Sequence, residues 1–246
     1  YGTPRVSLRI AMWSGPRNIS TAMMRAWENR PDTVVWDEPF YGHYLQHTGL
    51  PHPGADEVIA AQDSEWETVA AKCTGAIPHG ADIFFQKHMT HHMLEHISRD
   101  WMKELVNCFL IRQPDEVLAS YLRSREEATA DDLGFARQAE LVETAKNLQG
   151  EVIILESSDL LKDPRGAFGA LCEHLRIPFT DAMLSWPPGK RDSDGVWGQY
   201  WYDAVWASTG FQTYRPRNVE TPAHLQPIVD ECQGYYETLY AERFQF

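Results

Sequence analysis

Short apolar runs alternate along the chain with longer segments whose apolar residues recur at helical spacing. The runs cover Val6–Trp13, Thr33–Trp36, Ile83–Gln86, Val106–Ile111 and Val152–Leu155. Runs of this length are typical of buried β-strands, and their alternation with helices predicts a mostly parallel sheet that is covered by helices on both faces. The pattern therefore predicts the α/β class, built as a three-layer sandwich.

Helical spacing is found between these runs and after the last of them. The predicted helices are Ile19–Asn29, Glu57–Lys72, His91–Glu104, Pro114–Arg125, Asp131–Leu148, Pro164–Leu175 and Leu225–Tyr240. Residues 50–56 and 187–214 are the least regular, and no internal repeat or low-complexity tract divides the chain. We therefore expect one domain over residues 1–246.

Composition narrows the class of protein. A chain of 246 residues with 43% hydrophobic content can bury a substantial core. Its cysteines have neither metal-type nor disulfide-type spacing, which is typical of a reducing compartment. No apolar run approaches the roughly 20 residues that span a bilayer. These features predict a cytoplasmic protein without a membrane partner.

The charge of the chain bears on its partners. Acidic residues number 35 against 22 basic ones, which gives a formal net charge of −13. Such a surface disfavours nucleic acid and anionic membranes. Local basic clusters are therefore more informative, because they must hold an anion against the unfavourable field of an acidic protein.

A first anion site is predicted where the first strand runs into a helix, through WSGPRNIST at residues 13–21. Backbone N–H groups at the helix start, with the hydroxyls of Ser20 and Thr21, can hold anionic oxygens while Arg17 supplies positive charge. The lysine of a Walker A loop, GxxxxGK[ST], is missing. An ordinary N-capped helix after a buried strand is the alternative explanation.

A second anion site follows the strand Val106–Ile111. Arg112 stands at the strand end, and Pro114 has the fixed φ that suits a first helical turn. Ser120, eight residues after Arg112, shares a helix face with Glu116. Open α/β sheets bind ligands at the carboxyl edge, and the planar arginine fork matches phosphate. The spacing therefore predicts a phosphate site at Arg112 and Ser120.

The two sites, taken with LESSDLLKDP at residues 155–164 and GKRDSDGVW at residues 189–197, resemble the sulfotransferases that use 3′-phosphoadenosine 5′-phosphosulfate (PAPS). The resemblance spans most of residues 8–197 in separate blocks. It implies a P-loop nucleotide-binding type of fold. It also implies an enzyme that moves the sulfuryl group of PAPS, released as the bisphosphate PAP, to a hydroxyl or amine of a small-molecule acceptor by in-line displacement without a metal.

The resemblance also implies roles for individual residues. The residues implied for the 5′-phosphosulfate are Arg17, Asn18, Ser20 and Thr21. Those implied for the 3′-phosphate are Arg112 and Ser120, with Lys190 and Arg191 as a lid. Lys87, after the third strand, would approach the transferring sulfuryl group, and with Arg17 it would supply the positive charge that this chemistry needs. Two positions depart from the family pattern: Ile19 replaces a frequent glycine, and Ser157 replaces a frequent tyrosine.

Two residues compete for the role of general base. Glu38 follows the second strand and should emerge at the same sheet edge, where some sulfotransferases with RSGTT-like loops place a catalytic glutamate. Its alternative role is a cap before Pro39, with Asp37 the more structural of the two carboxylates. His88 follows Lys87, as a histidine follows the corresponding lysine in cytosolic sulfotransferases. Both candidates stay open at this point.

A group of histidines and a group of aromatic residues each have two interpretations. His88, His91, His92 and His96 include a pair at helical ligand spacing, His92 and His96, but no cysteine or carboxylate set completes a zinc site, so no metal site is assigned. The stretch WGQYWYDAVWASTGF at residues 197–211 predicts either core packing or an apolar wall for the acceptor or adenine.

Two other functions remain open. A P-loop small-molecule kinase would need a phosphate-loop lysine and magnesium ligands, which the first loop lacks. A non-catalytic nucleotide-binding or interaction domain would need only the anion sites. The sequence indicates neither the acceptor nor the oligomeric state.

Overall fold

Five parallel strands form the central sheet of the computed structural model, which describes residues 7–216 and 219–246. In sequence they are β1 (Leu8–Ser14), β2 (Thr33–Asp37), β3 (Ile83–Met89), β4 (Val106–Ile111) and β5 (Ile153–Glu156). Each predicted apolar run forms one of these strands, and the predicted α/β class is confirmed. Val6, where the first predicted strand begins, lies outside the described residues.

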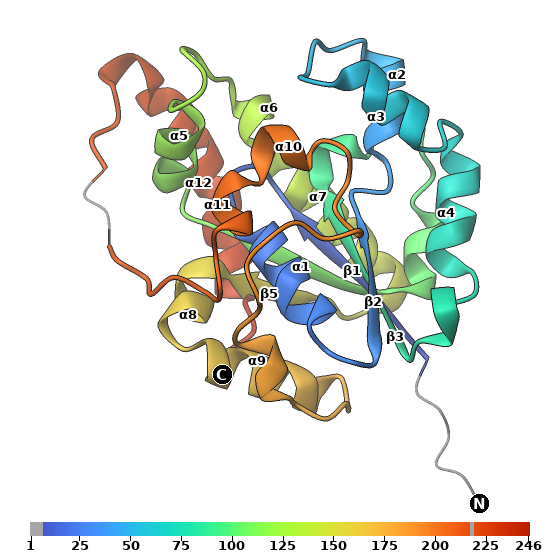
Figure 1. The fold of residues 1–246 in the computed structure, drawn as a ribbon. Helices are drawn as coiled ribbons and strands as arrows, with labels where there is room; N and C mark the ends of the chain where they lie inside the picture. Colours follow the sequence, from blue (N-terminus) through green and yellow to red (C-terminus); the bar gives the residue numbers. More distant parts are fainter. Residues whose placement is uncertain (1–6, 217–218) are drawn as a thin grey trace, which may run out of the picture.

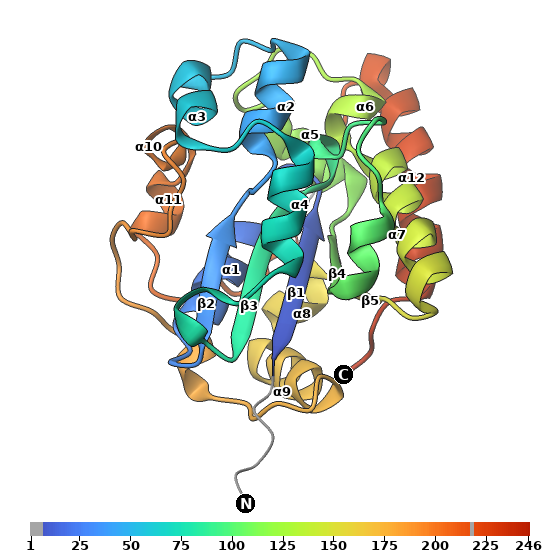
Figure 2. The same cartoon turned by 90° about the vertical axis from the view of Figure 1, so that its right-hand side faces the viewer.

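Helices cover both faces of the sheet (Figure 1 and Figure 2). One face packs on α1 (Ser20–Glu28), α8 (Ser157–Lys162) and α9 (Pro164–His174). The other packs on α4 (Trp66–Thr74), α7 (Phe135–Gln149) and α12 (Gln226–Ala241). Successive strand residues point to opposite faces, so Met12 belongs to the first core and Trp13 to the second. The three layers arise from this alternation.

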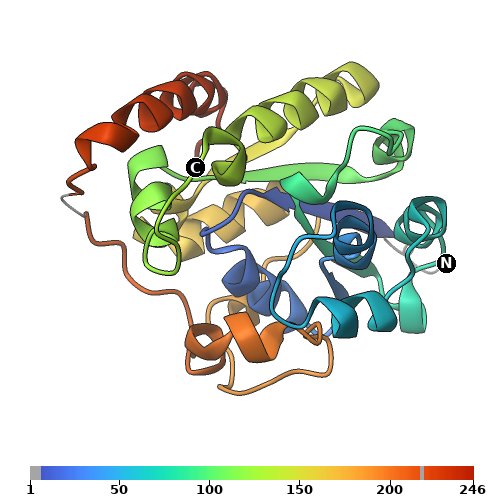
Figure 3. The same ribbon diagram turned by 90° about the horizontal axis from the view of Figure 1, so that it is seen from above.

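Shorter elements complete the chain, and several of them surround the carboxyl edge of the sheet (Figure 3). The α-helices are α2 (Tyr41–Thr48), α3 (Ala55–Ala61), α5 (Pro114–Tyr121), α6 (Ala130–Leu133), α10 (Gly198–Trp201) and α11 (Asp203–Trp206). The 3₁₀-helices are η1 (Pro78–Gly80), η2 (Thr90–His92), η3 (Asp100–Glu104), η4 (Asp181–Met183) and η5 (Ala223–Leu225).

The strand order positions the site. The strands lie side by side as β2-β3-β1-β4-β5, so the chain leaves the central β1 toward one edge and later crosses to β4 on its other side. In open α/β sheets the crevice at such a reversal, outside the carboxyl ends of the strands, is where ligands bind. The loops after β1 and β4, which carry the two predicted anion sites, meet at this crevice.

Two predicted helices are each broken in two. The segment Glu57–Lys72 stops at Gln62, which is extended (φ −124°, ψ 159°) and whose side chain accepts from Gly42 N and donates to the Glu38 carbonyl. The segment Asp131–Leu148 breaks at Gly134, whose φ of 76° ends α6 and begins α7. In both places tertiary contacts or glycine override the helical period.

The predicted helix His91–Glu104 is wrong. Only the 3₁₀-helices η2 and η3 form there. Between them the Arg99 guanidinium donates to the carbonyls of Met93, Leu94 and Ile97, which replaces the hydrogen bonds of a helix. The short helices α2 and α8, which the sequence pattern did not indicate, also form.

Candidate active site

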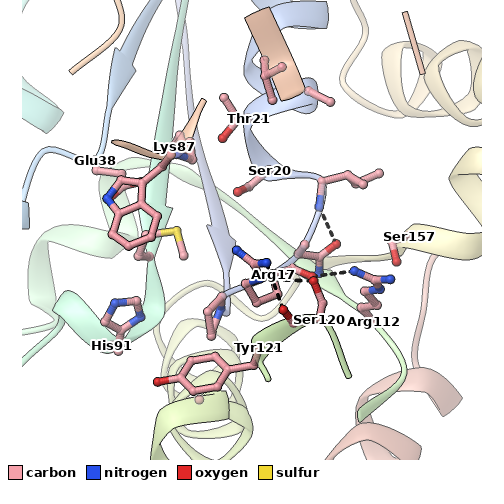
Figure 4. A pocket seen from close by; sticks show the side chains of 18 of the residues that line it. Arg17, Ser20, Thr21, Glu38, Lys87, His91, Arg112, Ser120, Tyr121 and Ser157 are labelled. Atoms are coloured by element: carbon pink, nitrogen blue, oxygen red, sulfur yellow. Dashed lines mark hydrogen bonds and ion pairs between the residues drawn. The ribbon is translucent and has the colours of Figure 1, made fainter. Parts of the chain in front are cut away.

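A cavity of about 1580 Å³ opens at the carboxyl edge of the sheet (Figure 4). Its wall includes most of the residues predicted for the site: Arg17, Asn18, Ser20, Thr21, Glu38, Lys87, Arg112 and Ser120. Figure 4 shows Arg17, Arg112 and Ser120 on one side of the cavity and Glu38 and Lys87 on another, with Ser20 and Thr21 between them. The cavity therefore has an arginine-rich half and a half with a buried ion pair.

Residues of the two predicted anion sites are in direct contact. Arg17 Nε donates to Ser120 Oγ at 3.1 Å, and its Nη2 donates to the Ser120 carbonyl at 2.9 Å. Arg112 Nη1 donates to the Arg17 carbonyl at 2.7 Å, and its Nε donates to a carboxylate oxygen of Glu116 at 3.0 Å. The side chain predicted for the 5′-phosphosulfate thus lies beside the residues predicted for the 3′-phosphate.

Positive charge is concentrated in this half of the cavity. Burial lowers the pKa of the Arg17 guanidinium, and the nearby charges of Arg123 and Arg112 lower it further. Arginine stays protonated at neutral pH in spite of such a shift. An anion bound between these guanidinium groups would relieve their repulsion, so the electrostatics favour a phosphate or sulfate here.

The loop between β1 and α1 is shaped by close contacts. A Cβ on Gly15 would lie 3.2 Å from the Leu133 carbonyl oxygen. Arg17 has a left-handed backbone (φ 58°), which is unfavourable for a residue with a Cβ. Asn18 Nδ2 donates to the Leu110 carbonyl at 3.2 Å, and its Oδ1 accepts from Ile19 N at 2.8 Å. The Asn18 side chain thus braces the loop against β4.

The second half of the cavity is built around Lys87, two residues before the end of β3. Lys87 Nζ donates to Glu38 Oε1 at 2.7 Å, to Asp37 Oδ1 at 3.0 Å and to Tyr202 Oη at 2.6 Å. Tyr202 Oη in turn donates to Asp37 Oδ2 at 2.7 Å, and Gly195 N donates to the same oxygen at 3.1 Å. Asp37 therefore holds the network together, as expected for the more structural carboxylate.

Burial sets the ionisation of this network. Burial alone would lower the pKa of Lys87, but Asp37 and Glu38 more than offset it, and the pKa lies well above its ordinary value. Burial raises the pKa of the Glu38 carboxyl; Lys87 opposes the rise and Asp37 adds to it. Glu38 also has a left-handed backbone (φ 42°). A carboxyl with a raised pKa at a strained position in a cavity is typical of a general base.

The structure does not bring His88 to the cavity. Lys87 and His88 are adjacent on β3, so they point to opposite faces of the sheet. His88 is 2% exposed, stacks on Trp13 at 4.4 Å between ring centroids, and its Nε2 lies 3.0 Å from Gln86 Oε1. Burial lowers its pKa to about 3. The period of two along the strand is the signal that separates His88 from Lys87.

The structure does not bring Lys190 and Arg191 to the cavity either. Lys190 Nζ lies over the Trp206 ring, 4.5 Å from its centroid. Arg191 Nη2 donates to the Pro187 carbonyl at 2.9 Å, and its Nε is 3.9 Å from a carboxylate oxygen of Glu28. Arg125 and Arg215, which no sequence pattern marks as site residues, line the cavity instead.

The aromatic stretch 197–211 contributes both to core packing and to the cavity wall, the two roles considered from the sequence. Trp197 and Tyr202 are 2% and 4% exposed and pack with Tyr41 of α2 in a small core. The same three residues line the cavity. Tyr202 was not predicted as a site residue, because nothing in the sequence marks one tyrosine of this stretch as the partner of Lys87.

Two of the predicted histidine cluster face the cavity. His91 and His92 lie in its wall, and His92 Nε2 is 3.9 Å from Glu38 Oε2. Burial lowers the pKa of His91 to about 4 and that of His92 well below its ordinary value, so both rings are neutral at pH 7. His92 and His96 are not one turn apart on a helix, since that helix does not form.

Among the described residues no helix is long and apolar enough to cross a membrane.

Known proteins resemble the chain in sequence and in fold. The branched-chain-amino-acid aminotransferase-like proteins 1 and 2 of Arabidopsis thaliana are 30% and 28% identical to it over 231 and 230 residues. The match covers 94% of this chain but 41% of each relative, so the chain spans about two fifths of their length.

Solved structures share the fold at low sequence identity. The sulfotransferase domain of the Synechococcus PCC 7002 olefin synthase has a TM-score of 0.59 at 17% identity, over 100% of this chain and 98% of that domain. A sulfotransferase from Alicyclobacillus acidocaldarius has a TM-score of 0.56 at 11% identity, over 98% of each chain.

The family itself is fixed by a sequence model. The model described as "Sulfotransferase domain" matches residues 8–225. This range contains all five strands and every residue of the cavity named above. The resemblance stated from the sequence is thereby confirmed, and the chain belongs to the sulfotransferase domain family.

Proposed function

We propose that this protein transfers the sulfuryl group of PAPS to a hydroxyl or amine of a small-molecule acceptor. The observation that carries the proposal is the pairing of two unlike groups in one cavity. Arg17 and Arg112 form a cationic cluster around Ser120 at one end, and the buried Lys87–Glu38 pair lies elsewhere in the same wall. A donor with a phosphate at one end and a reactive sulfuryl group at the other matches such a division.

The donor would be held by its phosphates. Arg112 and Ser120 are the residues proposed for the 3′-phosphate, and Arg17, which already bonds to Ser120, would bridge from this phosphate toward the loop. Ser20 and Thr21 line the cavity at the start of α1, where hydroxyls and the helix N-terminus favour the 5′-phosphosulfate. Asn18 would support this loop through its bond to the Leu110 carbonyl.

The transfer step needs positive charge and a proton acceptor. Lys87 would stabilise negative charge on the sulfuryl oxygens and on the oxygen that bridges to the phosphate. Glu38 would take the proton of the acceptor hydroxyl or amine as the new bond to sulfur forms and the bond from sulfur to the bridging oxygen breaks, with PAP leaving. The raised pKa of Glu38 strengthens it as a base, and Tyr202 and Asp37 would keep Lys87 in place.

The acceptor would enter beside the rings of α2 and of the aromatic stretch. Tyr41, Tyr44, His91 and Trp197 line this part of the cavity. Rings of this kind provide rigid apolar contact area with polar tips, which suits a small molecule with a flat or apolar body. His92, close to Glu38, would face the acceptor group as a neutral imidazole.

Ligand-dependent melting curves test the proposal. The protein is heated with adenosine 3′,5′-bisphosphate, with adenosine 5′-monophosphate, with ATP, and with ATP plus Mg²⁺. A ligand that binds only the native state stabilises it by RT ln(1 + [L]/Kd), so the bisphosphate should raise the melting temperature most. The two adenosine phosphates differ by the 3′-phosphate alone, and an equal response to both would overturn the proposed 3′-phosphate site.

Measurements of turnover distinguish a sulfotransferase from the two alternative functions, a kinase and a non-catalytic domain. A response to ATP plus Mg²⁺ equal to that of the bisphosphate would favour a kinase. Binding of the bisphosphate without transfer to any acceptor would favour a non-catalytic domain. A screen of hydroxyl and amine acceptors with ³⁵S-labelled PAPS should instead yield a labelled product, and the same screen identifies the acceptor class.

A further inference from the structure

Three histidines outside the cavity lie against one another. His43 and His47 are one turn apart on α2, and His96 lies on the segment between η2 and η3. Within the described chain, each can offer one ring nitrogen so that the three nitrogens lie within 4.8 Å of one another. His43 is buried, whereas His47 and His96 are exposed, so the group is anchored at one end and open to solvent at the other.

Backbone carbonyls fix the position of the ring proton on two of these imidazoles. His43 Nδ1 is 2.5 Å from the Ser64 carbonyl oxygen, and His47 Nδ1 is 3.0 Å from the His43 carbonyl oxygen. A carbonyl only accepts, so both Nδ1 atoms carry protons and both Nε2 atoms present lone pairs. Metal-bound histidines are oriented by this same arrangement, in which the second ring nitrogen donates to a backbone carbonyl.

The third imidazole completes the group. His96 Nε2 lies 2.8 Å from His43 Nε2, and the rings of His47 and His96 are 5.0 Å apart between centroids. Since His43 Nε2 presents a lone pair, the proton of this contact lies on His96 Nε2, and the ion would replace it. Nitrogens that share a tetrahedral zinc at 2.0–2.1 Å lie about 3.3 Å apart, so His43 Nε2 and His96 Nε2 would separate by roughly half an ångström.

Buried neighbours and backbone hydrogen bonds hold the segment that carries His96 in position. Met93 and Ile97 are buried on either side of His96, and Arg99 donates to the carbonyls of both. The backbone is thus fixed while the exposed His96 side chain is free to adjust its rotamer. A site whose ligands are already assembled loses little entropy when the ion binds.

We propose that His43, His47 and His96 bind one divalent transition metal ion, with Zn²⁺ the best match. Imidazole nitrogen is a preferred ligand of zinc, and three such ligands leave one position of a tetrahedron for water or a further group. The ion would tie α2 to the segment after β3. These two elements carry Tyr41 and His92 of the cavity wall, so the metal stabilises that wall from outside, separately from the transfer chemistry.

Metal binding to tag-free, chelator-treated protein tests the proposal. Calorimetric titration should give one Zn²⁺ per chain, Co²⁺ should give the visible spectrum of a tetrahedral site, and Zn²⁺ should raise the melting temperature. His47→Ala and His96→Ala are the test variants, because both residues are exposed and their loss spares the core. His224→Ala, an exposed histidine outside the group, is the matched control.

Loss of a supporting partner already weakens zinc sites 10–100-fold, so loss of a ligand should weaken binding by at least about 100-fold in each test variant. The double variant should bind no stoichiometric Zn²⁺, and its melting temperature should not respond to the ion. His224→Ala should behave as the unaltered protein does. Failure of the unaltered protein to bind one equivalent, or equal binding by the double variant, would overturn the site.

Discussion

Lys87 Nζ lies 2.7 Å from Glu38 Oε1, and both residues are buried at the carboxyl ends of the neighbouring strands β3 and β2. The backbone supports the contact, since Glu38 N donates to the Lys87 carbonyl at 2.9 Å and so extends the pairing of the two strands by one residue. Because the two side chains are this close, the charge of Glu38 affects the charge that surrounds Lys87. Protonation of Glu38 leaves Lys87 with Asp37 as its carboxylate partner, so the network tolerates transfer of a proton to Glu38.

Glu38→Gln should leave donor binding intact and greatly lower kcat. Glutamine keeps the shape of the side chain but cannot take the acceptor proton, and loss of a general base costs about 10²–10⁴-fold in rate. The measurement is kcat with labelled PAPS, alongside the melting shift with the bisphosphate. Retained turnover would remove Glu38 from the role of base.

The same residue predicts the acid limb of the pH profile. Burial raises the pKa of Glu38, so the fraction of ionised, active base should fall as pH drops through a value above the ordinary range of a glutamate. We expect kcat/KM of the unaltered enzyme to fall on this side. The residual activity of Glu38→Gln should lack that limb, and an unchanged limb would assign it to another group.

Arg112→Ala should weaken the adenosine bisphosphate and spare the monophosphate. A hydrogen bond to a charged group contributes about 1.5–3 kcal/mol, which corresponds to roughly a 10–100-fold loss of affinity. Calorimetric Kd values for both ligands give the comparison. Arg165→Ala is the control, because its exposed guanidinium pairs with Asp181 away from the cavity. Equal weakening of both ligands would place Arg112 elsewhere on the donor.

Much of this arrangement can be predicted from local patterns in the sequence. The apolar runs locate all five strands, and the spacing of Arg112 and Ser120 after β4 brings both to the cavity. These features depend on local period and on the rule that parallel strands end at one edge. A resemblance to known sulfotransferases adds Glu38 and Lys87, which also line the cavity.

The structure differs from the sequence prediction where contacts between distant segments determine the local conformation. Arg99 takes the carbonyls that a helix over residues 91–104 would use, and no local period reveals this. Tyr202 reaches Lys87 across 115 residues of chain. His43 and His96 meet only because α2, itself unpredicted, lies over the segment after β3. The position of His88 is different: strand alternation alone indicates that Lys87 and His88 point to opposite faces of the sheet.

His88 makes stability depend on pH. Its pKa is about 3 in the folded protein against an ordinary 6.5, because burial disfavours the charged ring. A group with a depressed folded pKa contributes stability above its unfolded pKa, and that stability is lost as pH falls. Between about pH 7.5 and pH 5 the loss from this one residue is roughly 2 kcal/mol. Urea unfolding at both pH values measures it, and in His88→Gln the decline should be smaller by that amount; an equal decline would contradict the assignment.

Arg25 and Asp194 give a prediction for the segment that carries Lys190 and Arg191. Arg25 Nη2 donates to both carboxylate oxygens of Asp194, at 2.6 and 2.8 Å, and the two side chains are 1% and 5% exposed. Asp194 also accepts from Arg191 N and from Trp206 Nε1, each at 2.9 Å. The ion pair therefore anchors this segment to α1.

Removing one partner of a buried pair leaves the other charge uncompensated, so Arg25→Met should lower the free energy of unfolding by about 3–5 kcal/mol. Asp194→Asn should also destabilise the protein, although Arg25 keeps a carboxylate partner in Glu28, and the double variant should lose less than the sum of the two, because it removes both charges of the pair. Urea unfolding of the four proteins gives the coupling energy. Additive losses would show that the two side chains act independently, and the segment would then need another anchor.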